Sequence, residues 1–209
     1  MIKTIFFDVG YTLVNEDAVW ERRCKDQAAT DEAKRFGVTA EDIYHEIEKV
    51  TIEGLPQYRT VIERFNFSEM MPYHHELETM YEDAPQVLKA LSEKHTLGVI
   101  ANQAEGLRER LKNFGILQHF KYVISSWDVK FMKPDIRIFE YALKAANCQP
   151  QDAVMIGDRI DNDIAPAQSL GMKSVWIKQG FGKLQTALAA ANPPDYEVDN
   201  LIELLKIFL

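Results

Sequence analysis

The sequence predicts an α/β protein: a doubly wound parallel β-sheet with helices on both faces and a helical segment inserted after the first strand. Two observations support this prediction. Short apolar runs recur along the chain, and from about residue 84 onward they alternate with segments of helical periodicity. The 209 residues are 46% hydrophobic, which is enough apolar surface for a core that offsets the entropy lost on folding.

Five apolar runs are the candidate strands. None of them alternates between apolar and polar residues, and such continuous runs are typical of strands covered on both faces, as in parallel sheets. The runs are Ile5–Phe7, Leu97–Ile100, Tyr122–Ile124, Ala153–Ile156 and Ser174–Ile177. We therefore expect all five in one sheet.

Between and after these runs, apolar residues recur at the spacing of amphipathic helices. Three sets have this spacing: Leu107, Leu111 and Phe114; Phe139, Leu143 and Ala146; and Leu201, Leu204, Leu205 and Phe208. Pro134 suits the first turn of the middle helix, because a proline there gives up no helical hydrogen bond. The alternation of these helices with strands predicts the doubly wound arrangement.

The connection from the first strand to the second has no convincing strand of its own. The next candidate strand begins near Thr96, and the intervening residues show helical spacing, such as Trp20, Cys24 and Ala28. A connection of this length is too long for a loop. We therefore expect an inserted domain made of helices.

We expect this helical insertion to span residues 15–82, which leaves a core of residues 1–14 and 83–209. Helix-breaking residues divide the insertion into several helices, at Gly37, Gly54–Pro56 and Met71–Pro72. Hinges between the two parts are expected near Leu13–Asn15 and Glu82–Pro85.

The amino-acid composition limits the classes of partner that the protein can bind. Lys and Arg number 24 against 32 Asp and Glu, a net charge of −8, whereas nucleic-acid binding relies on clustered cations. No stretch approaches the roughly 20 apolar residues of a membrane span, and the apolar start is too short for a signal peptide. Cys24 and Cys148 lie far apart, without metal or redox spacing. We therefore expect a soluble cytoplasmic protein with neither nucleic acid nor membrane as partner.

Polar residues follow the predicted strands at the ends where parallel sheets collect ligands. They are Asp8 after the first strand, Asn102 after the second, Lys133 beyond the third, and Asp158, Asp161 and Asp163 after the fourth. Carboxylates gathered at one edge repel one another unless a cation lies among them. Because their oxygens are hard ligands, the cluster favours Mg²⁺ over zinc.

The order and spacing of these residues resemble the haloacid dehalogenase superfamily, a group of mostly Mg²⁺-dependent phosphohydrolases with a Rossmann-like core and a mobile helical cap. The resemblance covers essentially the whole chain. Residues 8–12, Asp-Val-Gly-Tyr-Thr, stand at the place of the motif D-x-D-x-T and keep its first Asp and its Thr. Lys133-Pro134 matches the lysine motif, and Asp158 with Asp163 matches the acidic motif.

The resemblance implies a role for each matching residue. Asp8 would be the nucleophile that forms an aspartyl-phosphate, and Lys133 would neutralise charge around the phosphoryl group. The implied metal ligands are Asp8, Asp158, Asp163 and the backbone carbonyl of Gly10. The implied substrate contacts are Thr12, Asn102 and Lys133. The expected activity is Mg²⁺-dependent hydrolysis of a small phosphate ester, and no oligomeric state is predicted.

Two positions depart from the family pattern. Gly10 stands where the family has its second aspartate, the general acid that protonates the leaving oxygen and then activates water. Ala101 stands where the family usually has Ser or Thr, so a hydroxyl contact to the phosphoryl group is lost. General acid–base help is commonly worth about 10²–10⁴-fold in rate. We therefore expect weakened general-acid catalysis.

These departures leave other functions open. A catalytically impaired relative that binds a phosphorylated ligand or a protein partner without turnover is favoured by Gly10 and Ala101 and opposed by Asp8 and Lys133. A phosphonatase would need a lysine in the cap, for which the candidates are Lys25, Lys34 and Lys49. Dehalogenases lack the acidic motif, and phospho-acceptor receiver domains lack a long insertion, so both are disfavoured.

Two side chains beside the motifs have alternative roles. Arg159 either forms a structural ion pair or leans toward a substrate anion. Tyr11 either lines the entrance under the cap or acts as a weak substitute proton donor. The sequence alone favours neither role for Arg159, and for Tyr11 it favours the entrance.

Overall fold

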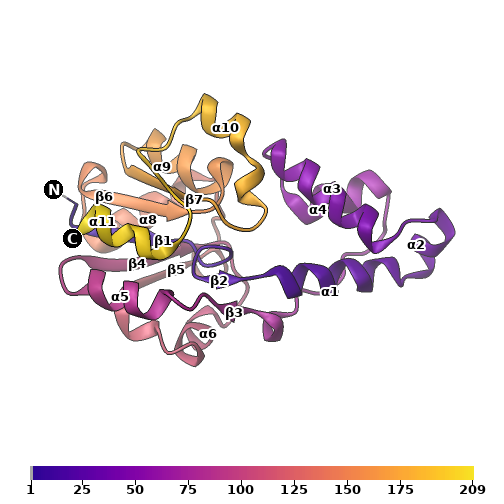
Figure 1. The fold of residues 1–209 in the computed structure, drawn as a ribbon, viewed down its shortest axis with the longest axis horizontal. Coiled ribbons are helices and arrows are strands. Elements are labelled where there is room, and N and C mark those ends of the chain that lie inside the picture. The colour runs from indigo at the N-terminus through magenta and orange to yellow at the C-terminus, as the bar shows by residue number, and fades with distance from the viewer. Residues whose placement is uncertain (1) are drawn as a thin grey trace.

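A six-stranded parallel sheet with helices on both faces forms the larger part of the computed structural model, which describes residues 2–209 (Figure 1). The strand order is β5-β4-β1-β6-β7-β8. The strands are β1 (Thr4–Phe7), β4 (Thr96–Ala101), β5 (Phe120–Ser125), β6 (Ala153–Gly157), β7 (Lys173–Ile177) and β8 (Tyr196–Val198). Because β1 pairs with both β4 and β6, the residue that follows β1 lies in the middle of the sheet edge.

Side chains of β1 alternate between two apolar layers, one on each face of the sheet. Ile5 and Phe7 pack in one layer, with α5 (Ala84–Ser92), α6 (Leu107–Asn113) and α11 (Leu204–Phe208). Phe6 packs in the other, with α8 (Ile136–Ala146) and α9 (Ala165–Ser169). The short helices α7 (Ser126–Val129) and α10 (Thr186–Ala191) are the remaining helices of the part of the chain that contains the sheet. Coverage of both faces explains why the strand sequences are continuously apolar.

Four helices project from the sheet as an arm (Figure 1). They are α1 (Asp17–Ala28), α2 (Asp31–Phe36), α3 (Ala40–Ile52) and α4 (Gln57–Phe65). Their buried faces form a separate apolar cluster that includes Trp20, Ile43 and Ile47, and Tyr11 and Phe181 reach this cluster from outside the four helices. The helices therefore have a core of their own, joined to the sheet by a few aromatic side chains.

The two segments that connect this arm to the sheet lie side by side. Strand β2 (Val14–Asn15) pairs antiparallel with β3 (Thr79–Met80), with Val14 opposite Met80. The predicted second hinge, Glu82–Pro85, falls just after this ribbon, and Pro85 lies in the first turn of α5. The two connecting segments are thus held together by main-chain hydrogen bonds.

The structure confirms the predicted α/β fold and places every predicted strand in the parallel sheet. Three features differ from expectation. The two-residue strands β2 and β3 lie in the connection for which only helices were expected, because strands this short give no apolar run. Strand β8 was not predicted, because two of its three residues, Tyr196 and Glu197, are exposed and give no apolar run. Pro134 does not open a helix: α8 begins at Ile136, and Asp135 caps it by accepting a hydrogen bond from the backbone N–H of Arg137.

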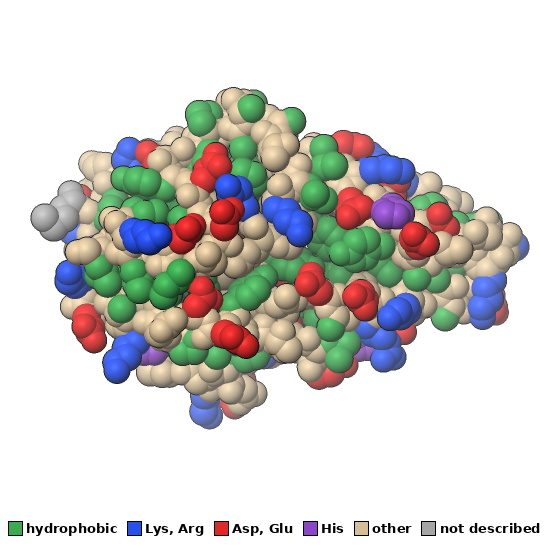
Figure 2. Space-filling view, viewed as in Figure 1, with side chains coloured by type: hydrophobic (Ala, Val, Ile, Leu, Met, Phe, Trp, Pro, Cys, Tyr) green, Lys and Arg blue, Asp and Glu red, His purple; other side chains and the backbone are tan. Residues whose placement is uncertain are grey.

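The visible surface carries both signs of charge. Figure 2 shows Lys and Arg side chains interspersed with Asp and Glu on this face, without one continuous basic field. Among residues 2–209, every helix falls short of the length and apolar character that crossing a bilayer requires.

The separate core of the arm makes a stability prediction. Ile47 of α3 is fully buried, whereas Ile52 at the end of the same helix is 44% exposed. Ile47→Ala should lower the free energy of unfolding by about 2–5 kcal/mol because it leaves a cavity, and Ile52→Ala should change it by less than about 0.5 kcal/mol. Urea denaturation of both variants measures the difference. Equal losses would show that the cluster is not a packed core.

Candidate active site

A pocket of about 310 Å³ lies between the carboxyl edge of the sheet and the helical arm. The sheet side contributes Asp8, Gly10, Asn102, Lys133, Asp158 and Asp163. The arm and its connections contribute Glu16, Trp20, Gln57, Tyr73 and His75. Both parts of the chain therefore line one cavity, and its size suits a small molecule.

Asp8 is placed by the central strand of the sheet. It follows β1 directly, and its backbone N–H donates to the carbonyl of Ile156 in β6 at 2.9 Å. Its side chain is only 14% exposed. Asp8 therefore presents a carboxylate of fixed position at the floor of the pocket.

Lys133 is held from both ends. Its backbone N–H donates to Oδ1 of Asn102 at 2.7 Å, and Nδ2 of Asn102 donates to the carbonyl of Lys133 at 2.8 Å. Its Nζ lies 2.7 Å from Oδ1 of Asp8 and 2.5 Å from Oδ1 of Asp163. Burial by itself would lower the pKa of Lys133, but the charges of Asp163 and Asp8 outweigh burial and raise it. The ammonium group is therefore a fixed positive charge between two carboxylates.

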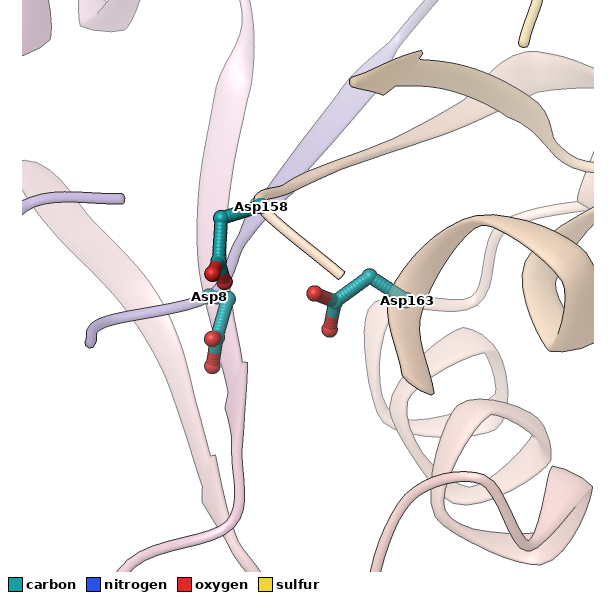
Figure 3. A group of neighbouring side chains, drawn as sticks. All are labelled: Asp8, Asp158 and Asp163. Carbon is teal, nitrogen blue, oxygen red and sulfur yellow. The ribbon is translucent and has the colours of Figure 1, made fainter. Parts of the chain in front are cut away.

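Asp158 and Asp163 come from the end of β6 and the turn after it. Residues Ile160–Ile164 form a single π-helical turn that carries Asp163 back toward the strand, where its Oδ2 accepts from the N–H of Arg159 at 3.0 Å. Gly157 makes this approach possible, since a Cβ there would lie 2.4 Å from Cγ of Asp163. Figure 3 shows the carboxylates of Asp8, Asp158 and Asp163 directed toward a common space.

The three aspartates carry more negative charge than the protein neutralises. One oxygen from each lies within 4.8 Å of the others, and Lys133 is the cation paired with two of them. Burial raises the pKa of Asp163 to about 6, against the opposing effect of Lys133. Burial, together with repulsion from Asp163 and Asp8, raises the pKa of Asp158 well above its usual range. Because the ligands are hard oxygens and the charge surplus is negative, the cluster fits a divalent cation that prefers oxygen ligands.

Six of the seven residues predicted for the site line this pocket, and Thr12 does not. The Thr12 side chain is fully buried, and its hydroxyl has no hydrogen-bond partner among residues 2–209. Asn102 lines the pocket, but both the nitrogen and the oxygen of its side-chain amide are hydrogen-bonded to the backbone of Lys133. The candidate phosphonatase lysines, Lys25, Lys34 and Lys49, are absent from the lining formed by the described residues.

The hydrogen-bond partners of Arg159 and Tyr11 decide between the alternative roles of these residues. Arg159 donates to both oxygens of Asp161, at 2.8 and 2.6 Å, and to the carbonyl of Leu55 at 3.2 Å, so it ties the sheet edge to the arm. The hydroxyl of Tyr11 donates to Oδ1 of Asp17 at 3.0 Å. Burial raises the pKa of Tyr11 far above its ordinary value, which makes it a poor proton donor.

Glu16 lines the pocket and was not predicted. It lies between β2 and α1, is 7% exposed, and accepts a hydrogen bond at Oε2 from Nε1 of Trp20 at 3.1 Å. Burial raises its pKa to about 7. No sequence spacing indicates this residue, because only the folded turn after β1 brings it back to the strand end.

Comparison with known proteins agrees with this fold. The model of the haloacid dehalogenase-like hydrolases matches residues 5–177. A glyceraldehyde 3-phosphate phosphatase of Pyrococcus furiosus is 30% identical, over 99% of this chain and 92% of its own. The pyrophosphatase PpaX of Bacillus mycoides is 26% identical, over 99% of this chain and 96% of its own.

Solved structures show the same architecture. A HAD phosphatase from Thermococcus onnurineus superposes with a TM-score of 0.70 at 25% identity, covering 99% of this chain and 97% of its own. A predicted phosphoglycolate phosphatase from Haemophilus somnus shares the fold with a TM-score of 0.73 at 20% identity, covering 100% of this chain and 98% of its own. The expected superfamily is thereby confirmed: the chain belongs to the haloacid dehalogenase-like hydrolases.

Proposed function

We propose that this hydrolase is a Mg²⁺-dependent phosphatase that cleaves small phosphate monoesters through an aspartyl-phosphate on Asp8. One observation carries the proposal: Nζ of Lys133 lies 2.7 Å from Asp8 and 2.5 Å from Asp163, inside a pocket that also holds Asp158. The names of the curated relatives, which include phosphatases acting on glyceraldehyde 3-phosphate, support the same reaction class.

Asp8 would act first. An oxygen of its carboxylate forms a bond to phosphorus while the bond from phosphorus to the alcohol oxygen breaks. Water then attacks the phosphorus of the aspartyl-phosphate, the bond to Asp8 breaks, and inorganic phosphate leaves. Two displacements of moderate difficulty replace one difficult displacement.

Lys133 and the carboxylates would prepare the site for the negative charge of the phosphoryl group as it is transferred. The ammonium of Lys133 is already oriented by its two ion pairs and by Asn102, so it stabilises the anionic transition state without reorganising. Asp8, Asp158, Asp163 and the backbone carbonyl of Gly10 would hold Mg²⁺. When bound, the cation supplies Lewis-acid polarisation of a phosphoryl oxygen.

Residues 15–82 would act as the cap that closes this site. The β2–β3 ribbon supplies two adjacent connections about which the arm can move, and side chains such as Trp20 and Gln57 contribute its half of the pocket. Closure would exclude water and select the substrate. The volume of about 310 Å³ favours a small phosphorylated metabolite.

Binding without turnover is the less supported function. Gly10 and Ala101 favour it. However, a protein that only binds its ligand does not need a buried lysine paired with a carboxylate at the position of the nucleophile. The described site keeps both partners of that pair at 2.7 Å.

Replacement of the nucleophile tests the covalent mechanism. Asp8→Asn preserves the shape of the side chain but removes the attacking charge, so kcat on a phosphate ester should fall below detection. Asp128→Asn is the matched control, because Asp128 is exposed and is not among the residues that line the pocket. Turnover of Asp8→Asn near that of the control, with both proteins folded by circular dichroism, would reject the mechanism.

Metal binding can be tested without measuring activity. Mg²⁺ at about 100 times its Kd should stabilise the folded state by about 2.7 kcal/mol and raise the Tm. Asp158→Asn should shrink this Mg²⁺-dependent rise. Asp161→Asn should keep it, because the side chain of Asp161 bonds Arg159 and Gln185. An undiminished rise in Asp158→Asn would place the metal elsewhere.

A further inference from the structure

The carboxyl group of Glu16 occupies the space beside Gly10. A Cβ added to Gly10 would lie 2.2 Å from Oε1 and 2.8 Å from Cδ of Glu16. Gly10 does not have the left-handed backbone conformation that favours glycine. Position 10 is therefore restricted by space, and a side chain there would enter the volume that the Glu16 carboxyl fills.

The turn after β1 delivers Glu16 to this place. The N–H groups of Leu13 and Val14 both donate to the carbonyl of Val9, at 2.8 and 3.0 Å, and Gly10 bridges to Val14. The chain thus folds back on the strand end, and Glu16 lies over Gly10 as α1 begins. This geometry comes from the local turn and does not require closure of the arm.

The two oxygens of Glu16 have different surroundings. Oε2 accepts the hydrogen bond from Nε1 of Trp20, one helical turn further along the chain, which fixes the plane of the carboxyl group. Oε1 is the oxygen directed at Gly10. Glu16 lines the same pocket as Asp8 and Lys133, and its Oε1 fills the space of a side chain at position 10, two residues along the chain from Asp8.

We propose that Glu16 supplies the general acid–base function at this site, in place of the carboxylate that Gly10 lacks. The inference rests on the proposed phosphatase activity and adds a catalytic residue to it. Gly10 and Glu16 form a complementary pair: the missing side chain at position 10 makes room for the carboxyl that arrives from position 16.

The proton balance follows the two displacements. In the first, Asp8 bonds to phosphorus, the phosphorus–oxygen bond to the alcohol breaks, and the proton of the Glu16 carboxyl passes to the departing oxygen. In the second, the Glu16 carboxylate takes a proton from the attacking water as the bond from phosphorus to Asp8 breaks. Inorganic phosphate is released, and Asp8 and Glu16 regain their starting protonation.

Leaving-group chemistry distinguishes this role from a structural one. Alkyl alcohols leave poorly without a proton, whereas nitrophenolate leaves without one. With Mg²⁺ present, Glu16→Gln should lower kcat/KM for glyceraldehyde 3-phosphate by about 10²–10⁴-fold. The loss for 4-nitrophenyl phosphate should be below about tenfold, since kcat/KM reports transfer of the phosphoryl group to Asp8.

Glu78→Gln is the matched control. Glu78 is also a buried glutamate near the arm, but its carboxylate pairs with His75 at 2.9 Å and Arg110 at 3.5 Å, and it does not line the pocket. The ratio of kcat/KM between the two substrates should not change in this variant. Equal losses on both substrates in Glu16→Gln would assign Glu16 a merely structural role and overturn the proposal.

A second pair of variants moves the carboxyl back to position 10. Gly10→Asp combined with Glu16→Ala should regain at least about tenfold on glyceraldehyde 3-phosphate over Glu16→Ala alone. Absence of any gain, in proteins with matching Tm, would contradict the exchange of carboxyls between the two positions. If the unmodified protein hydrolyses neither substrate with Mg²⁺, the phosphatase function itself is rejected, and the role of Glu16 with it.

Discussion

The ammonium of Lys133, held between Asp8 and Asp163, is the interaction on which the site depends. Three carboxylates converge at the carboxyl edge of the sheet, and Lys133 offsets one of their charges. Removing a partner from a buried ion pair leaves an uncompensated charge, which is costly. The surplus negative charge that remains suits a divalent cation, so the repulsion among these carboxylates favours binding of a metal ion at this edge of the sheet.

Much of this arrangement was predictable because its signals are local. Continuous apolar runs predicted the five main strands, and the order of strands brought Asp8, Lys133 and Asp158 to one edge. Glu16 was missed because its position depends on a folded turn and on the empty space at Gly10. The placement of Thr12 differs for a related reason: the same turn buries its hydroxyl away from the pocket.

The pairing of Gly10 with Glu16 changes how the absence of the family's second aspartate is interpreted. Judged alone, Gly10 suggests a weakened or inactive site. In the folded chain, a buried carboxyl from the start of the arm lies where a side chain at position 10 would extend. Because Glu16 directly precedes α1, the group proposed to move protons also belongs to the connection about which the cap would close.

The covalent role of Asp8 is tested most directly by trapping the intermediate. The protein is mixed with Mg²⁺ and 4-nitrophenyl phosphate, quenched in acid during turnover, and digested for mass spectrometry. We predict a phosphoryl adduct on the peptide that carries Asp8, lost on treatment with hydroxylamine as an acyl phosphate should be. Turnover with no adduct on Asp8 at any quench time, or with an adduct on another residue, would contradict the central role of Asp8.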